Sequence, residues 1–148
     1  SCGVTAENNT VKDHNLAGVL LENVWSMFPH VIGNLIEGNS LTGMNIIGAT
    51  RATIINNEIL NNFRSGIAFN SFYRSGVVSS EAVTIESNEI HHNSFAGIAT
   101  INYIPEALLI KGNNLHHNTK AGIAFFNAAD VKMNDESNGI PVPRSEAK

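Results

Sequence analysis

The chain has 148 residues, a formal net charge of −4 at pH 7 and only nine lysines and arginines. This length fits one domain with a hydrophobic core, and the scarcity of cations argues against a nucleic-acid-binding surface, because phosphate binding needs a basic stripe. Cys2 is the only cysteine, which excludes an internal disulfide, and no apolar run approaches the ~18 residues of a membrane span.

Short apolar stretches begin near the first residue and recur along the chain. Val4 and Ala6 form the first stretch. Equivalent pairs, two residues apart, follow at Ala52 and Ile54, Val83 and Ile85, and Leu108 and Ile110. This alternation, in runs interrupted by Asn, Gly and Ser, predicts short β-strands with one buried face, and no helical stripe of useful length is present.

A repeated motif organises these strands. It reads Asn-x-aliphatic-x-x-(Asn or His)-x-x-x-Gly-aliphatic, and its anchors are Val11, Ile36, Ile59, Ile90 and Leu115. Successive anchors lie 25, 23, 31 and 25 residues apart. Periods of this length are typical of solenoids. Each strand should therefore lie on its equivalent in the next turn, parallel and about 4.8 Å away.

The asparagine three residues after each anchor has a physical reason in such a stack. Stacked asparagines donate and accept amide hydrogen bonds from turn to turn, each with a net value of roughly 1 kcal/mol. The predicted ladder consists of Asn39, Asn62, Asn93 and Asn118. The glycine seven residues after each anchor indicates a bend with positive φ or a close approach of two backbone segments.

This repeat resembles that of the right-handed parallel β-helix proteins, the pectin-lyase-like superfamily, over residues 4–134. The resemblance implies an all-β, right-handed parallel β-helix solenoid of about five turns over residues 1–134, with residues 135–148 as a terminator and tail. It does not select a function, because the superfamily includes polysaccharide lyases, hydrolases and epimerases as well as copper-protein maturation factors, adhesins and interaction modules. It suggests an extracellular, cell-surface or periplasmic location, and calcium is the only cofactor that it implies.

The two ends predict a neighbour. The first strand starts almost at Ser1, and Val131 and Met133 begin a sixth turn that stops near Pro141 and Pro143, which cannot donate to a strand ladder. Solenoid ends need polar caps. We therefore expect a segment of a longer solenoid, or end-on packing against another domain or chain.

Connectors of variable length precede the first strand of each turn and carry many of the large aromatic side chains. Because the turns stack, these connectors should emerge along one edge. Aromatic rings and guanidinium groups stack on sugars and hold carboxylates or sulfates. The predicted edge for a polysaccharide or other glycan consists of Trp25, Phe28, Arg51, Phe72, Tyr73, Arg74 and Tyr103.

The sequence is consistent with two interpretations of this edge. The aromatic residues could bind a sugar polymer, and in the resembled family such polymers commonly lie against the strand that follows the connector. The outward residues of that strand are here Thr5, His30, Thr53, Thr84 and Leu109. Alternatively, the aromatic residues form a lid over the core, or the contact surface of a non-catalytic scaffold or protein-interaction module.

Paired carboxylates for sugar hydrolysis are not evident. Glu7 and Glu86 should lie three turns apart, about 14 Å by the strand spacing, which is too far for the two carboxyl groups of a glycosidase. Glu58 and Glu89 should stack on adjacent turns, but on the asparagine side of the solenoid rather than beside the connectors.

Lyase chemistry in the resembled family uses a calcium-binding acid cluster with an arginine or lysine base. The nearest candidates are Glu86, Lys111 and Arg74, although Glu86 and Lys111 are also suited to an ordinary ion pair between turns. Whether the protein is an enzyme therefore stays open. An enzyme of this fold would be a polysaccharide lyase, hydrolase or epimerase.

The doubled histidines invite a metal-site hypothesis. His91 and His92 occupy the same motif positions as His116 and His117 one turn later, so they should stack on the outer surface. Two imidazoles about 5 Å apart could share a zinc or copper ion. No cysteine or carboxylate in the sequence pattern completes a clear ligand set, so metal handling is the remote alternative function.

Overall fold

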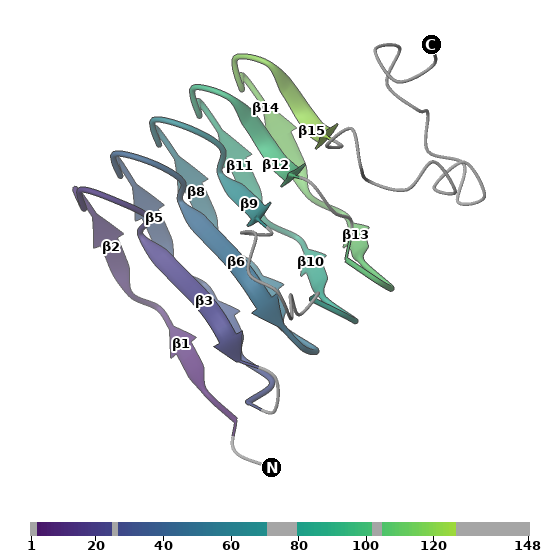
Figure 1. The fold of residues 1–148 in the computed structure, drawn as a ribbon. Coiled ribbons are helices and arrows are strands. Elements are labelled where there is room, and N and C mark those ends of the chain that lie inside the picture. Colours follow the sequence, from purple (N-terminus) through teal and green to yellow (C-terminus); the bar gives the residue numbers. More distant parts are fainter. Residues whose placement is uncertain (1–2, 25–26, 71–79, 102–104, 127–148) are drawn as a thin grey trace, which may run out of the picture.

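The computed structural model describes residues 3–24, 27–70, 80–101 and 105–126, which form a parallel β-helix (Figure 1). Its fifteen strands form three parallel sheets of five strands each. Sheet A contains β1 (Thr5–Glu7), β4 (His30–Ile32), β7 (Thr53–Ile55), β10 (Thr84–Glu86) and β13 (Leu109–Lys111). Sheet B contains β2 (Thr10–Lys12), β5 (Leu35–Glu37), β8 (Glu58–Leu60), β11 (Glu89–His91) and β14 (Asn114–His116). Sheet C contains β3 (Val19–Val24), β6 (Met44–Ala49), β9 (Ile67–Asn70), β12 (Ala96–Ile101) and β15 (Ala121–Phe126).

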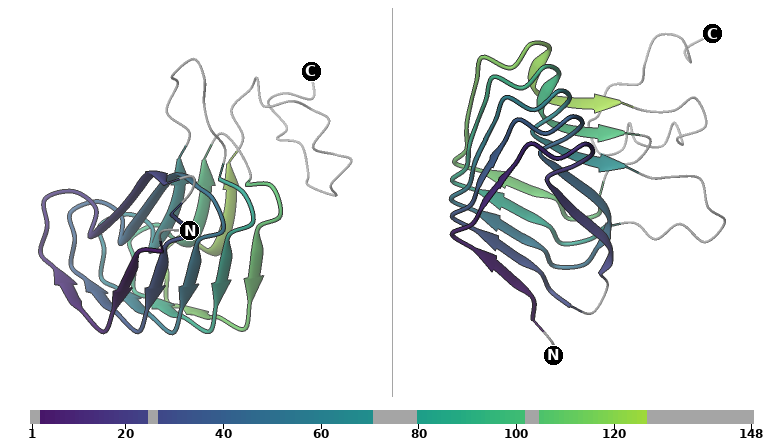
Figure 2. Two further views of the ribbon diagram at one scale, coloured as in Figure 1. Left: turned by 90° about the horizontal axis from the view of Figure 1, so that it is seen from below. Right: turned by 90° about the vertical axis from the view of Figure 1, so that its left-hand side faces the viewer.

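The chain visits sheets A, B and C in turn, and one such passage is called a rung here. Five rungs, and hence four complete turns from the first to the last, lie side by side along the solenoid (Figure 2). Ile59 pairs with Ile90, and Ile90 pairs with Leu115, in parallel register. The prediction that anchors of successive repeats lie one above the other is confirmed.

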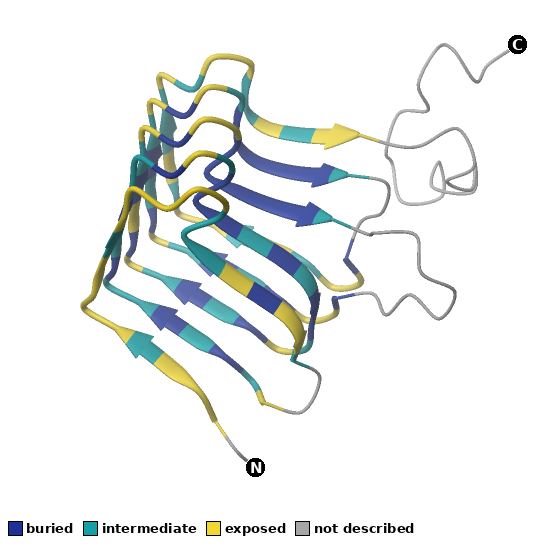
Figure 3. Ribbon diagram, turned by 60° about the vertical axis from the view of Figure 1, so that its left-hand side comes forward, coloured by how far each residue is buried: buried dark blue, intermediate teal, exposed yellow. Residues whose placement is uncertain are grey.

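Stacked aliphatic side chains fill the interior. Ile36, Ile59 and Ile90, the inward residues of sheet B in the middle rungs, have no exposed surface. Burial of each such side chain contributes roughly 1.5–3 kcal/mol. The end rungs are more exposed (Figure 3), and Ile123 of β15 retains 39% exposure, because a terminal rung has a described neighbour on one side only.

Asparagine ladders run along two corners of the solenoid. The predicted ladder lies between sheets B and C, where the amide nitrogens of Asn39, Asn62 and Asn93 each donate to Oδ1 of the ladder residue one rung later, at 2.9–3.0 Å. A second ladder lies between sheets A and B and consists of Asn9, Asn34, Asn57, Asn88 and Asn113. The prediction of a ladder at one turn was therefore correct in its residues but incomplete.

A residue with a left-handed backbone precedes each ladder asparagine. Before the second ladder these residues are Asn8, Gly33, Asn56, Ser87 and Gly112. Before the predicted ladder they are Gly38, Asn61, His92 and His117, and Asp13 has the same backbone before His14, the equivalent residue of rung 1. The motif glycines themselves lie outside the left-handed region, so close packing rather than positive φ explains those of the first four rungs.

Thr100 is a buried polar side chain of the core that lacks a partner among the described residues. It lies in β12 between Phe69 and Phe125 in the register of sheet C and is 1% exposed, and no described residue bonds to its hydroxyl. A buried hydroxyl without a partner costs about 1–3 kcal/mol. We expect Thr100→Val to raise the free energy of unfolding by about 1 kcal/mol, measured by urea denaturation. A loss of stability would indicate that the hydroxyl has a partner after all.

The described residues contain no helix that is long and apolar enough to cross a membrane. The predicted terminator and tail, residues 135–148, and the start of a sixth turn at Val131 and Met133 lie outside the described residues.

Candidate functional site

Of the predicted ligand edge, the structure describes Phe28 and Arg51. The guanidinium carbon of Arg51 lies 5.3 Å from the centroid of the Phe28 ring, in the range of a cation–π contact. Both residues have a left-handed backbone at the corner where the chain enters sheet A, as do Ala82 and Ala107 in later rungs. The remaining residues of the predicted edge, Trp25, Phe72, Tyr73, Arg74 and Tyr103, lie outside the described residues.

The outer face of sheet A has the predicted register. Thr53 pairs with His30 on one side and with Thr84 on the other, and Thr84 pairs with Leu109. These side chains form a column along the solenoid axis, directly after the corner that carries Arg51.

The weak catalytic candidates of sheet A form an ordinary surface pair. Lys111 Nζ lies 3.5 Å from Glu86 Oε1, and the two side chains retain 66% and 34% exposure. An exposed ion pair of this kind contributes little to stability. Glu7 lies three strands from Glu86 in sheet A, as predicted, so these two carboxylates do not form a catalytic pair.

An open groove follows the corner between sheets A and B over rungs 3–5. Its lining is polar apart from one glycine, and consists of Asn56, Asn57, Glu58, Ser87, Asn88, Glu89, Gly112 and Asn114. These residues come from equivalent positions of successive repeats. Each rung contributes its left-handed turn residue and the first residue of its sheet B strand, and rungs 3 and 4 also contribute the ladder asparagine between them. The predicted stacking of Glu58 and Glu89 is confirmed, whereas no sequence pattern predicted the groove.

Hydrogen bonds hold the Glu89 carboxylate in place within this groove. Asn114 Nδ2 donates to both carboxylate oxygens, at 2.9 and 3.1 Å, and His116 Nε2 lies 2.5 Å from Oε1. The hydrogen bond from His116, followed by that from Asn114, lowers the pKa of Glu89 below its ordinary value of 4.5. Glu89 is therefore ionised at neutral pH and is poorly suited to act as the protonated carboxyl that glycoside hydrolysis requires.

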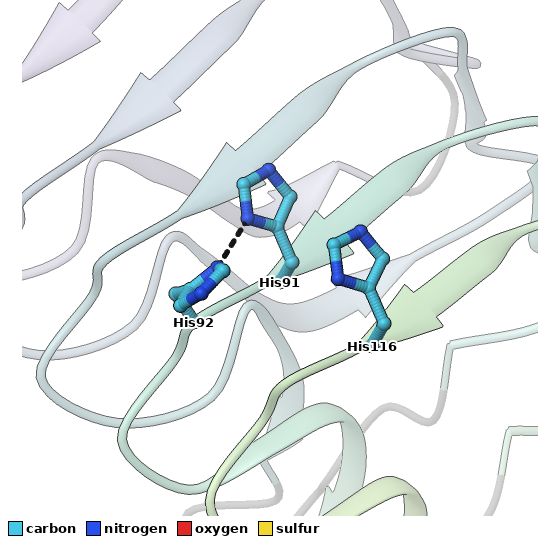
Figure 4. Close-up of side chains that lie close together, drawn as sticks. All are labelled: His91, His92 and His116. Carbon is cyan, nitrogen blue, oxygen red and sulfur yellow. Dashed lines mark hydrogen bonds between the residues drawn. The ribbon is translucent and has the colours of Figure 1, made fainter.

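The four paired histidines form an array on sheet B and the turn that follows it, and Figure 4 shows three of them, His91, His92 and His116. The rings of His91 and His116 stack with centroids 4.8 Å apart, and those of His92 and His117 stack at 5.0 Å. Within each rung the two rings stand nearly perpendicular, and their Nδ1 atoms lie 2.7 Å apart. The predicted stacking is confirmed.

Desolvation and neighbouring charge act on His92. Desolvation by the adjacent side chains, followed by the charges of His117, His91 and His116, lowers the pKa of His92 below its ordinary value of 6.5. The ligand nitrogens of His91, His92 and His116 lie within 4.8 Å of one another, so rotation of the His116 ring would bring all three to one metal ion. The structure also places carboxylates at the array, which the sequence pattern alone did not show.

The repeats match a known protein family. Residues 1–81 and 70–137 match the right handed beta helix region. The chain belongs to this family. No curated protein and no solved structure matches it.

Membership of the right handed beta helix family confirms the resemblance drawn from the repeat motif. It agrees with the three parallel sheets and the stacked asparagines. The family match shows the fold and indicates no substrate. The surface of this β-helix is therefore the evidence for its function.

Proposed function

We propose that this right-handed β-helix is a glycan-binding module, in which an extended polysaccharide lies along the solenoid axis. The groove between sheets A and B carries this proposal, because its hydrogen-bonding side chains recur from rung to rung. Rungs are about 4.8 Å apart, which is close to the repeat of an extended sugar chain. One rung can thus contact one sugar residue.

The groove chemistry favours a neutral sugar polymer. Asn56 and Asn114 supply amide donors and acceptors, and Glu58 and Glu89 supply acceptors for sugar hydroxyl groups. The same carboxylates repel uronates and sulfates. We propose binding without cleavage, because Glu89 is hydrogen-bonded in its ionised form.

The Arg51–Phe28 pair extends the proposed surface across sheet A. It lies at the opposite corner of this narrow sheet, beyond the column that contains Thr53 and Thr84. An aromatic ring with a guanidinium group suits the face and the hydroxyls of a sugar. A glycan ligand further implies a protein located at the cell surface, outside the cell or in the periplasm.

A glycan array with neutral and acidic polysaccharides tests this function. We expect neutral polymers to bind, and Asn114→Ala and Arg51→Ala each to weaken binding about tenfold, which corresponds to roughly 1.4 kcal/mol. Arg51→Ala should preserve the fold, since Ala82 and Ala107 have the same left-handed backbone at the equivalent position.

Arg64→Ala is the matched control, because Arg64 is an exposed arginine outside the groove, between sheets B and C. It should bind glycans like the unchanged protein. Equal losses in Arg51→Ala and Arg64→Ala would point to non-specific charge. No binding to any glycan would contradict the proposal and favour the scaffold or protein-interaction reading.

A further inference from the structure

Carboxylates orient two of the four paired histidines. His91 Nε2 lies 3.4 Å from Glu58 Oε1, and His116 Nε2 lies 2.5 Å from Glu89 Oε1. An ionised carboxylate only accepts hydrogen bonds, so it favours the tautomer with the proton on Nε2 and the lone pair on Nδ1. Carboxylates orient metal-binding histidines in this way in many proteins.

The freed Nδ1 atoms face a second imidazole. Nδ1 of His91 lies 2.7 Å from Nδ1 of His92, and the same distance separates Nδ1 of His116 from Nδ1 of His117. Either a proton or a metal cation can be shared between two such nitrogens. Two nitrogens on one tetrahedral zinc ion lie about 3.3–3.4 Å apart, because each Zn–N bond is about 2.0–2.1 Å. An adjustment of about 0.6 Å in partly exposed side chains would therefore admit the ion.

The backbone holds this array in register. His91 and His116 are paired residues of β11 and β14. His92 and His117 each occupy the left-handed position before a ladder asparagine, with φ of 55° and 53°. The solenoid therefore presents imidazoles from adjacent rungs at a separation that the strand spacing determines.

We propose that His91, His92, His116 and His117 bind a late first-row transition-metal ion, such as Zn²⁺ or Cu²⁺. An ion at the His91–His92 pair takes a third imidazole from His116 once that ring rotates toward it, because its ligand nitrogen lies within 4.8 Å of the other two but its ring is stacked parallel to that of His91. Imidazole ligands favour zinc, copper and nickel over magnesium and calcium. This site is independent of the proposed glycan function, although Glu58 and Glu89 border both.

Equivalent positions in neighbouring rungs supply substitutions that the fold already accepts. His92→Asn and His117→Asn each place asparagine where Asn61 lies in rung 3. The two remaining histidines supply matched controls. His30→Thr copies its register partner Thr53, and His14→Asn copies the ladder residue Asn39.

Isothermal titration of the untagged, metal-free protein with zinc chloride tests the site. We expect His92→Asn to weaken zinc binding at least tenfold, and the double variant with His117→Asn to abolish it. His30→Thr and His14→Asn should bind like the unchanged protein, and calcium chloride should give no binding. Glu89→Gln should weaken zinc binding about 10–100-fold if the carboxylate positions His116.

Copper provides a spectroscopic readout. The electron paramagnetic resonance spectrum of the Cu²⁺-loaded protein should show nitrogen hyperfine coupling from imidazoles, and the double variant should lose it. Circular dichroism melting in metal-free buffer checks that the variants fold. Zinc binding that is absent up to millimolar concentration, or unchanged in a folded double variant, would overturn the proposal.

The two proposals fail separately. Asn114→Ala should weaken glycan binding and leave the four histidine ligands in place, whereas the double His→Asn variant should lose zinc and keep the groove. If the protein bound zinc and no glycan, the result would support the metal-site proposal and contradict the glycan-binding proposal.

Discussion

Replacing Asn93 with leucine should lower the free energy of unfolding by about 3–5 kcal/mol. Asn93 is fully buried, and its amide nitrogen donates to the carbonyl groups of Ile59 and His91 and to Oδ1 of Asn118. Its Oδ1 accepts from the backbone and side-chain nitrogens of Asn62, at 3.1 and 2.9 Å. Leucine leaves these partners in a dry interior without hydrogen bonds, and each orphaned group costs about 1–3 kcal/mol.

Urea denaturation measures this loss as a lower transition midpoint. The control is Asn114→Leu, because Asn114 is an exposed asparagine of β14 whose side chain bonds to the Glu89 carboxylate. The control should lose less than about 1 kcal/mol. Equal midpoints for Asn93→Leu and the unchanged protein would show that the ladder does not stabilise the fold.

Replacing Gly43 with alanine should cost about 3 kcal/mol. A Cβ atom at this position would lie 2.6 Å from Ile59 Cγ2, 2.7 Å from the carbonyl oxygen of Gly66 and 2.8 Å from Asn62 Nδ2. That carbonyl oxygen already accepts a hydrogen bond from the Met44 nitrogen at 2.7 Å, so it cannot retreat without weakening sheet C. Overpacking of a rigid core costs typically 1–3 kcal/mol, and here a backbone group and a ladder amide would both have to move.

Gly122→Ala provides the matched control. Gly122 is the same motif residue in rung 5, where the nearest atom of the described residues to an added Cβ is Leu115 Cβ at 3.4 Å. Alanine should be tolerated there, with a change of less than about 1 kcal/mol, because it also restricts the unfolded chain. Thermal and urea denaturation of both variants would measure the difference. If both variants lost a similar free energy of unfolding, the backbone conformation, rather than contact with the next rung, would explain the glycine.

Spacing in the sequence was sufficient to predict the stack. The anchors from Val11 to Leu115 keep one motif despite connectors of different length, and a solenoid places equivalent residues of successive repeats next to each other. The contacts between rungs are therefore contacts between repeats, and the spacing alone pairs Asn62 with Asn93 and His91 with His116.

The second ladder shows where that reasoning was incomplete. Asn57 and Asn88 recur as regularly as Asn62 and Asn93, but a repeated asparagine does not reveal whether its amide points inward. The structure shows that each ladder follows a left-handed residue that turns the chain at a corner. The inward position of both amides follows from these two bends.

Periodicity thus determined the fold, the register and the stacking of the histidines, since all three depend on distance along a single axis. The groove, the carboxylates on His91 and His116, and the facing Nδ1 atoms depended on the folded chain. These features depend on how the chain bends at a corner and on which rotamers the side chains adopt. The spacing of residues in the sequence determines neither.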